Sequence, residues 1–567
     1  MNPRGSFRYP FGDVSCEYEF KALQENYPDY FYSLGRYTRE AIDEDHYLIV
    51  GRRGSGKTSL TRYFHFQNAI RSARCIDVNE PDIYDMVYQH VADQMAYVDR
   101  QLKTVAIGNA AKLWHFVIWS LIFNEYDHAI VHQHAPGLAP GALEHTALEQ
   151  KQAIAAQFRR FAGVAKNEMA KRIEAYLTSD EFCQAQRSVM QDTRRQPLIV
   201  AIDSLEKYDK NDDAMMATTA ALIQCASDFN VEYVQDGIHV KAFVAAEIFP
   251  HLKEQVVLNT AKYVRDPVYL HWWPRDLVHL VSWRFWKFLT STTTLAPIPP
   301  GSVKWANFDS VLETLWYPYF GTSLTNRTGF SERTFPYLLR HTQMRPRQFV
   351  QLCNAIAKQA RHDGYGIEYS RVDIPEVVKR VELELADEVI GSYSEIYPQV
   401  SAVVDALDEL PVTFQGNELD KVARTTRAAW SRSNYSLEAF RTLVAELGIV
   451  GKVRHRDRNG LYILGDFEYM MTDRLTLDSE DECVIHPMFF GKLHTRMTER
   501  VIVLPFPNHA DFGADYIRWM NPNVEPPKRP ASNGEAKHGE AKHGETKHGR
   551  SEGRRVRKSA GSAPGCL

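Results

Sequence analysis

The sequence has little of what marks a secreted or a membrane-spanning protein. Its seven cysteines are scattered with no C-x-x-C pair, a pattern typical of reduced thiols rather than of a disulfide framework or zinc site. The first 13 residues contain no apolar run that would serve as a signal peptide. The most membrane-like stretch, 113–123, contains His115 and falls short of the roughly 20 residues that a span requires. We therefore expect a buried helix there, in a cytoplasmic protein that does not contact a membrane.

A strong net charge is also missing. The formal net charge is −4, so no basic field over the whole chain indicates a nucleic-acid binder. The exception is the C-terminal end, where ten Lys and Arg stand against four Asp and Glu from Lys528 onward. Near-identical five-residue units begin at Gly534, Gly539 and Gly544, and such a segment cannot bury enough apolar surface to fold. We expect a disordered basic tail at 526–567.

One motif is present in full. The pattern G-x-x-x-x-G-K-[ST] is followed by a serine and consists of Gly51, Arg52, Arg53, Gly54, Ser55, Gly56, Lys57, Thr58 and Ser59. Its glycines let successive N–H groups face phosphate oxygens, and the helix expected from Lys57 presents its positive end to the same anion. In such a loop Lys57 reaches the β- and γ-phosphates, and the Thr58 hydroxyl binds Mg²⁺. The loop predicts binding of ATP with Mg²⁺.

A phosphate loop also needs an acidic residue at the end of a neighbouring strand. The apolar run 198–202 ends at Asp203, where we expect a second Mg²⁺ ligand, although such an aspartate can also be a helix N-cap. Ser204 follows, where many ATP motors place the carboxylate that activates water. Glu206 is the nearest acid, and it either polarises the water or is simply solvated. The sequence therefore predicts slow hydrolysis.

Apolar runs at 47–50, 198–202 and 240–246 predict strands of a parallel sheet that helices cover on both faces. Near the C-terminus, helical patterns precede two short strands, 450–456 and 461–464, with the hairpin signal Asn459-Gly460 between them. We therefore predict an α/β fold of the P-loop NTPase type. Its parts are a core at 1–270 with a helical insertion at about 82–195, a helical lid at 271–390, a winged-helix-like domain at 391–525, and the tail.

With these landmarks the chain resembles bacterial P-loop ATPases allied to the STAND and KAP classes. The landmarks are the phosphate loop, Asp203 to Glu206 as a D-x-L-[DE] signature, and the segments 11–17, 243–252, 334–356 and 445–489. The resemblance implies an ATPase core, a helical lid, a winged-helix module, assembly into homo-oligomers on ATP binding, and a regulatory or antiviral-defence setting. The family usually carries an arginine-acid pair where this chain has Ala246 and Glu247.

The lid has two candidate arginines, Arg345 and Arg347, on either side of Pro346. In AAA-like ATPases a lid arginine touches the γ-phosphate, where charge develops in the transition state. The resemblance assigns that role to one of the two, with Arg345 preferred. The alternative is that these arginines pair with a nearby acid or cap a helix.

Two further clusters carry weaker signals. His128, His132 and His134 follow Asp127 and include an i, i+4 pair that could bind a metal, but surface histidines at a helix end explain them more simply. The hairpin tip contains three arginines and a histidine, and three more arginines precede it, as in a wing that contacts nucleic acid: Arg454, His455, Arg456, Arg458, Arg424, Arg427 and Arg432. The candidate recognition helix, 436–447, has only Arg441 as a basic residue, which favours protein contact or solvation.

The main hypothesis is a slow, Mg²⁺-dependent ATPase, with Lys57, Asp203, Glu206 and Arg345 as its catalytic residues. Its nucleotide state would control homo-oligomerisation or the engagement of a separate effector protein. The first alternative is an ATP-dependent DNA-handling protein that uses the winged helix and the basic tail. The second is an interaction scaffold that binds ATP without turnover.

Overall fold

A computed structural model describes most of the chain, in segments. They are residues 9–32, 46–64, 73–78, 81–95, 103–126, 131, 138, 149–165, 168–203, 212–255, 260–291, 301–431, 434–457, 459–470, 474–497 and 500–506. The chain divides into two compact units, 1–524 and 525–567, and every described residue lies in the first unit.

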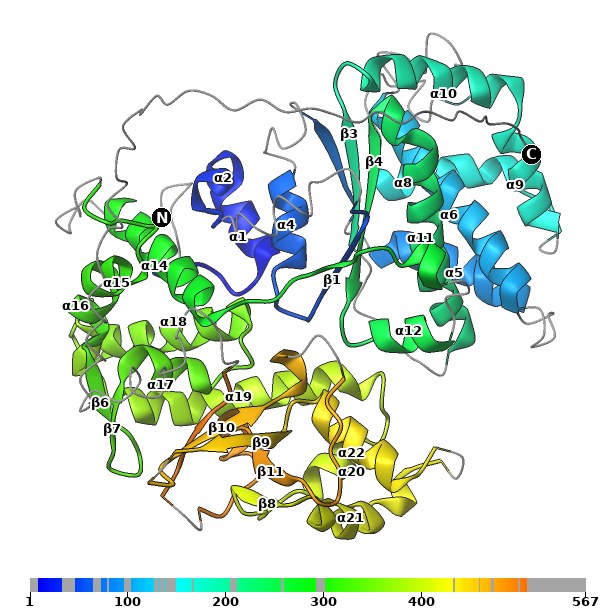
Figure 1. The fold of residues 1–567 in the computed structure, drawn as a ribbon. Coiled ribbons are helices and arrows are strands. Elements are labelled where there is room, and N and C mark those ends of the chain that lie inside the picture. The colour runs from blue at the N-terminus through cyan, green and yellow to red at the C-terminus, as the bar shows by residue number, and fades with distance from the viewer. Residues whose placement is uncertain are drawn as a thin grey trace, which may run out of the picture. The chain divides into compact units, whose positions relative to one another are not determined.

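A five-stranded, all-parallel sheet lies at the centre of the N-terminal half (Figure 1). Its strand order is β2-β3-β4-β1-β5. The strands are β1 (Leu48–Gly51), β2 (Arg74–Val78), β3 (Leu198–Asp203), β4 (Ile238–Ala245) and β5 (Val268–Tyr269). The three strands that the apolar runs predict are confirmed as β1, β3 and β4, whereas β2 and β5 are additional. Because the strands are parallel, Gly51, Asp203 and Ala245 all end at one edge of the sheet.

Helices cover both faces of this sheet, with α1, α2 and α4 on one side and α6, α8 and α11 on the other (Figure 1). The predicted α/β fold with a helix-flanked parallel sheet is therefore confirmed. The helices are α1 (Cys16–Leu23), η1 (Gln24–Asn26), α2 (Tyr27–Tyr30), α4 (Lys57–Phe64), α5 (Pro81–Met95), α6 (Lys103–Glu125), α8 (Gln150–Phe158), η5 (Arg159–Phe161), α9 (Met169–Leu177), α10 (Asp180–Thr193), α11 (Asp213–Tyr233), η7 (Val234–Asp236), α12 (Phe249–Gln255) and α13 (Thr260–Tyr263).

Helix α6 contains the apolar stretch 113–123. Among the described residues, Val105–Glu125 alone is long and apolar enough to cross a membrane, but 67% of its most apolar window is buried inside the protein. Trp114 and Trp119 of this helix are at most 1% exposed, and the helix packs against α11. The predicted buried helix is confirmed, since the apolar surface of α6 is used in the core.

A mostly helical segment, 274–394, follows the sheet. It also contains a short antiparallel hairpin, β6–β7, which the sequence did not predict. Helix α18 of this segment is amphipathic and buries Phe349, Leu352 and Ile356. The elements are α14 (Pro274–Ser291), α15 (Phe308–Val311), η8 (Leu312–Trp316), α16 (Tyr317–Phe320), β6 (Ser323–Thr325), β7 (Ser331–Arg333), α17 (Thr334–Arg340), α18 (Pro346–His362), η9 (Tyr369–Arg371) and α19 (Ile374–Ser394).

We call the described residues between 400 and 506 the C-terminal module. They form a second five-stranded sheet, of order β12-β10-β9-β11-β8, together with three α-helices. The predicted hairpin is confirmed as the antiparallel pair β9–β10, and Gly460 in its turn has a φ of +68°, which glycine adopts without strain. The elements are α20 (Val400–Asp405), β8 (Thr413–Gln415), α21 (Gly416–Thr425), η10 (Arg427–Ala429), α22 (Leu437–Glu446), β9 (Val450–Arg456), β10 (Tyr462–Asp466), η11 (Glu468–Met470), β11 (Glu482–Ile485), η12 (Pro487–Phe489) and β12 (Ile502–Leu504).

Candidate nucleotide site

The phosphate loop joins the end of β1 to the start of α4. Gly54 and Gly56 have φ angles of +75° and +97°, which L-residues with side chains rarely adopt. A Cβ atom on Gly54 would also lie 3.0 Å from the Cβ of Arg347. The motif glycines are therefore required for the turn that directs the chain into α4, whose N-terminal N–H groups favour an anion.

Lys57, the first residue of α4, lies over this turn. Its Nζ donates hydrogen bonds to the carbonyl oxygens of Gly51 at 2.9 Å and of Arg52 at 3.3 Å. The ammonium group is thus held by neutral acceptors within the loop, and a phosphate oxygen would be a stronger partner for it.

Thr58 and Asp203 lie together although they are far apart in the sequence. The Thr58 hydroxyl donates to Asp203 Oδ2 at 2.7 Å, and β4 separates the two strands that carry the loop and the aspartate. A hydroxyl and a carboxylate are the hard oxygen ligands that Mg²⁺ prefers. No group of three or more His, Cys, Asp or Glu side chains suited to a metal occurs among the described residues. A pair of ligands is nevertheless sufficient for Mg²⁺ that is bound together with phosphates, so these residues fit the ion.

Some predicted site residues lie outside the described residues. They are Glu206 with Ser204, the cluster Asp127, His128, His132 and His134, and Arg432, Arg458 and the whole tail.

Arg345 contacts the backbone of the phosphate loop, and its side chain is only 3% exposed. Its guanidinium donates to the carbonyl oxygen of Arg53 at 3.2 Å and to Gln343 at 2.9 Å. The buried Nε of Arg345 has no hydrogen-bond partner among the described residues. Arg345 thus adjoins the loop, with one donor left unused among the described residues.

Arg347 lies on the other side of Pro346. Its backbone N–H donates to the Gly54 carbonyl at 3.4 Å, and its guanidinium lies 3.3 Å from Glu388 Oε1. The Arg347 side chain is 35% exposed. Both arginines thus adjoin the loop, but Arg345 is buried against the loop backbone whereas Arg347 pairs with an acid near the surface.

Glu247 is a site residue to which the sequence patterns assign no role. It follows β4, and its Oε1 accepts the N–H of Arg53 at 3.0 Å and lies 4.0 Å from the Arg345 guanidinium. Burial alone would raise the pKa of Glu247, but the charges of Arg345, Lys57 and Arg52 outweigh burial and lower it. A buried, ionised carboxylate therefore holds the loop through its hydrogen bond from the Arg53 N–H. The one sequence signal for this role is that Glu247 follows an apolar strand, β4, which lies next to the strand that ends at Asp203.

Positive charge gathers around Glu247. Arg52 and Arg345 both donate to the Oε1 of Gln343, at 3.5 and 2.9 Å, so their guanidinium groups lie close to each other. Burial and the charge of Arg52 lower the pKa of Arg345. Together with the Lys57 ammonium they make three cations whose charges act on the one carboxylate of Glu247. An anion bound at the loop would offset this local excess of positive charge.

An apolar pocket opens beside the loop. Its aromatic and apolar lining includes Phe31, Trp272 and Pro346, and it reaches Ser55, Gly56 and Ser59 of the extended motif. Trp272 donates its indole N–H to the Ser55 carbonyl at 2.7 Å, which fixes the ring beside the loop. The buried Ser55 hydroxyl has no hydrogen-bond partner among the described residues. The cavity is small, about 70 Å³, and its aromatic rings offer surfaces on which a planar base can stack.

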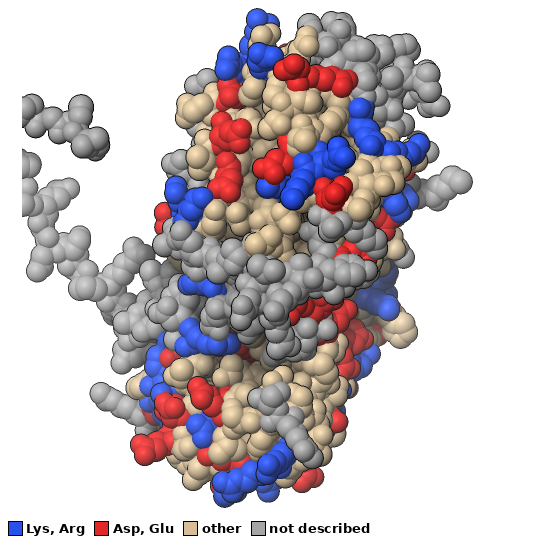
Figure 2. All heavy atoms as spheres, turned by 90° about the vertical axis from the view of Figure 1, so that its right-hand side faces the viewer, with Lys and Arg blue, Asp and Glu red and all other residues tan. Residues whose placement is uncertain are grey.

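The basic residues of the C-terminal module are largely paired with acids. Arg441 of α22 donates to Asp420 at 2.9 Å, and Arg454 of the hairpin lies 2.8 Å from Asp466. Arg456 forms an ion pair with Glu482. On the face seen in Figure 2, positive and negative side chains are interspersed without a large patch of one sign. Within the described part of the hairpin, these pairings leave little free positive charge for phosphate contacts.

Neither a protein-family model nor a curated protein matches this sequence. The resemblance to the STAND and KAP classes therefore stays an expectation that rests on the motifs.

Proposed function

We propose that this protein binds ATP with Mg²⁺ and hydrolyses it slowly. The observation that carries the proposal is the 2.7 Å contact between Thr58 and Asp203, made at the edge of a parallel sheet where Lys57 also lies. In open α/β sheets, ligands bind at the carboxyl ends of the strands. A phosphate loop, a lysine and a pair of oxygen ligands at that edge are the parts that a nucleoside triphosphate requires.

Each residue has a role in this proposal. The loop N–H groups and Lys57 hold the phosphates, while Thr58 and Asp203 hold Mg²⁺, which when bound neutralises charge on the phosphates. Trp272 and its neighbours accept the base by stacking. Glu206 orients the attacking water, and Ser204 in the position after Asp203 keeps turnover slow.

The lid arginines complete the site. Arg345 stabilises the loop through the Arg53 carbonyl and is the first candidate for the γ-phosphate contact, while Arg347 is the second, since both adjoin the loop. Lysine keeps the charge of arginine but not its rigid fork of donors. Phosphate release by Arg345→Lys and by Arg347→Lys therefore distinguishes the two, because only the variant of the contacting residue should slow the chemical step.

Hydrolysis by site variants tests the proposal. Asp203→Ala is expected to abolish Mg²⁺-dependent phosphate release, and Glu206→Gln to slow release while nucleotide binding is kept. Glu174→Gln is the matched control, because Glu174 is 55% exposed and pairs with Lys112 on the surface. Wild-type turnover in Asp203→Ala would remove the assignment of the Mg²⁺ site. Full turnover in Glu206→Gln would remove only the role of Glu206.

We further propose that the nucleotide state controls homo-oligomerisation or the engagement of an effector protein in the cytoplasm, in a regulatory or antiviral-defence setting. The order α20, β8, α21, α22 and the hairpin β9–β10 supports the winged-helix-like module that the resemblance implies. Helix α22 buries Phe440, Leu443 and Val444, so its apolar face serves the core. Light scattering with ADP, a nonhydrolysable analogue and no nucleotide tests this, and an equal mass in all three conditions with the partner present would contradict it.

DNA handling is the second candidate. The observation in its favour is the exposure of Arg424 and Arg427, in and just after α21. The paired arginines of the hairpin argue against it, because a phosphate contact would have to displace a carboxylate. Turnover that DNA stimulates, with a steep dependence on salt, would favour this candidate. Binding without any turnover would favour the scaffold.

A further inference from the structure

Arg52 belongs to the phosphate loop, yet its side chain leaves the loop. Its guanidinium donates to the Glu446 carbonyl at 3.2 Å and to the Tyr393 hydroxyl at 3.5 Å. The guanidinium carbon also lies 5.4 Å from the centre of the Tyr469 ring, within the range of a cation–π interaction. A residue of the nucleotide loop thus reaches the C-terminal module.

The contact is made at a place that favours a cation. Glu446 is the last residue of α22, and the final carbonyl groups of a helix have no partner within the helix and carry its negative end. Tyr393 donates to the same carbonyl at 2.9 Å, and Gln343 donates to the Leu447 carbonyl at 2.8 Å. Donors from the phosphate loop and the helical segment therefore cap the end of α22.

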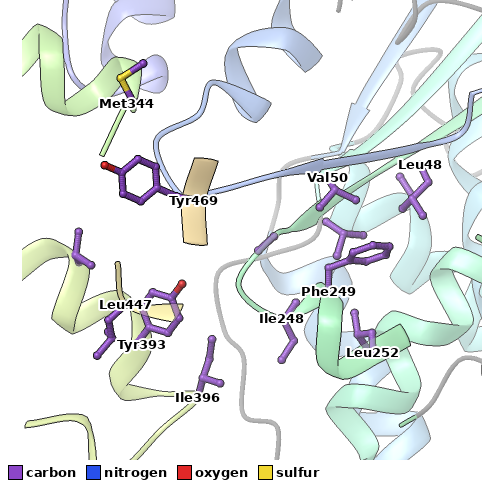
Figure 3. Packing of buried hydrophobic residues seen from close by; sticks show 14 of the residues in the cluster. Leu48, Val50, Ile248, Phe249, Leu252, Met344, Tyr393, Ile396, Leu447 and Tyr469 are labelled. Atoms are coloured by element: carbon purple, nitrogen blue, oxygen red, sulfur yellow. The ribbon is translucent and has the colours of Figure 1, made fainter. Parts of the chain in front are cut away.

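Close packing holds this junction together. Figure 3 shows Met344, Tyr393, Leu447 and Tyr469, members of one buried cluster, gathered beside the chain that leaves β1. Gly448 follows α22 with a φ of +66°, and a Cβ atom there would lie 2.6 Å from the side-chain nitrogen of Gln343. A side chain at this position would therefore strain the backbone and displace a donor that caps α22.

Three successive carbonyl groups of the loop accept hydrogen bonds. The Arg52 carbonyl accepts Lys57, the Arg53 carbonyl accepts Arg345, and the Gly54 carbonyl accepts the Arg347 N–H. These bonds fix the path of the loop, and an anion-binding loop depends on a fixed path because its N–H groups must converge on one ligand. The tether through the Arg52 side chain belongs to this arrangement.

We propose that the C-terminal module regulates nucleotide binding by holding the phosphate loop through Arg52, which makes Arg52 a positioning residue. This inference rests on the proposed function, because it concerns the same site. When Lys57 binds a phosphate, it gives up its hydrogen bond to the Arg52 carbonyl. Nucleotide binding therefore changes the contacts of Arg52, the same residue whose side chain is held by the C-terminal module. By linkage, a module that organises the loop for nucleotide is itself held more firmly when nucleotide binds.

The experiment combines calorimetric binding of Mg²⁺ with the nonhydrolysable analogue AMP-PNP and hydrogen exchange over 443–470. In the wild type, AMP-PNP is expected to slow exchange in this segment. Arg52→Ala and Tyr469→Leu should each weaken binding about fivefold or more and remove that response. The double variant should bind no worse than the weaker-binding single variant, because both changes break one contact.

Two controls separate coupling from damage. Tyr469→Phe keeps the ring beside Arg52 and should keep the response to nucleotide. Arg441→Ala breaks an ion pair inside the module, so it should speed exchange with and without AMP-PNP but leave the response in place. Additive losses in the double variant, or an unchanged exchange when AMP-PNP saturates the wild type, would overturn the coupling and leave the proposed function intact. Failure of AMP-PNP to bind the wild type would overturn both.

Discussion

Replacing Glu247 by Gln removes one charge from the buried cluster beneath the phosphate loop and little else. The amide keeps the size of the carboxylate and an oxygen that can accept the Arg53 N–H. What is lost is the attraction to the Arg345 guanidinium at 4.0 Å, for which Coulomb's law at an effective dielectric constant of about 20 gives about 4 kcal/mol. Removing one partner of a buried ion pair lowers the free energy of unfolding by about 3–5 kcal/mol, because the other charge stays buried without its partner.

We therefore expect Glu247→Gln to lower the free energy of unfolding by about 3–4 kcal/mol. Urea unfolding followed by tryptophan fluorescence measures this free energy. If unfolding occurs in more than one transition, the value is taken from the transition at the lowest urea concentration. Glu174→Gln provides the matched control: its pair with Lys112 is exposed, so its loss should cost less than about 1 kcal/mol. The double variant Glu247→Gln/Arg345→Gln should be more stable than the sum of the two single losses predicts. A Glu247→Gln protein as stable as the control would refute the buried ion pair.

Burial and the charge of Arg340 lower the pKa of His486 to about 3, so between about pH 6.5 and 3 the unfolded chain binds a proton that the folded protein does not. Stability should thus fall as the pH drops below 6.5, and His486→Gln should flatten that slope by up to about 1.4 kcal/mol per pH unit in urea titrations. Thr58→Ala should weaken the Mg²⁺ dependence of ATP binding, measured by calorimetry with and without EDTA. Truncation after Pro526 should leave the melting temperature and basal turnover unchanged, and a drop of several degrees would mean that the tail docks on the body.

The sequence predicts those parts of the site that have local signatures. The glycines around Lys57 require their own turn geometry, and Asp203 ends an apolar strand, so both could be placed without knowledge of the fold. The same holds for the β9–β10 hairpin, because the residues of its turn accept positive φ.

Glu247 and the reach of Arg52 could not be predicted in this way. Glu247 acts because β4 lies between β1 and β3, and strand order is set by packing over long sequence separations. The guanidinium of Arg52 meets Glu446 across 394 residues of sequence. Arg345 and Arg347 lie on either side of one proline, yet only the three-dimensional structure shows that Arg345 is buried and that Arg347 is partly exposed.

The proposed function depends above all on the binding of Mg²⁺ and a nucleoside triphosphate at the loop around Lys57. Isothermal titration calorimetry of the purified protein with Mg²⁺ and AMP-PNP, on the wild type and on Lys57→Ala, tests this most directly. We expect saturable binding to one site in the wild type and its loss in Lys57→Ala. The melting temperature should stay largely unchanged, because the Lys57 ammonium bonds to carbonyl groups of its own loop. Equal binding by the two proteins, or none by a folded wild type, would contradict the proposal.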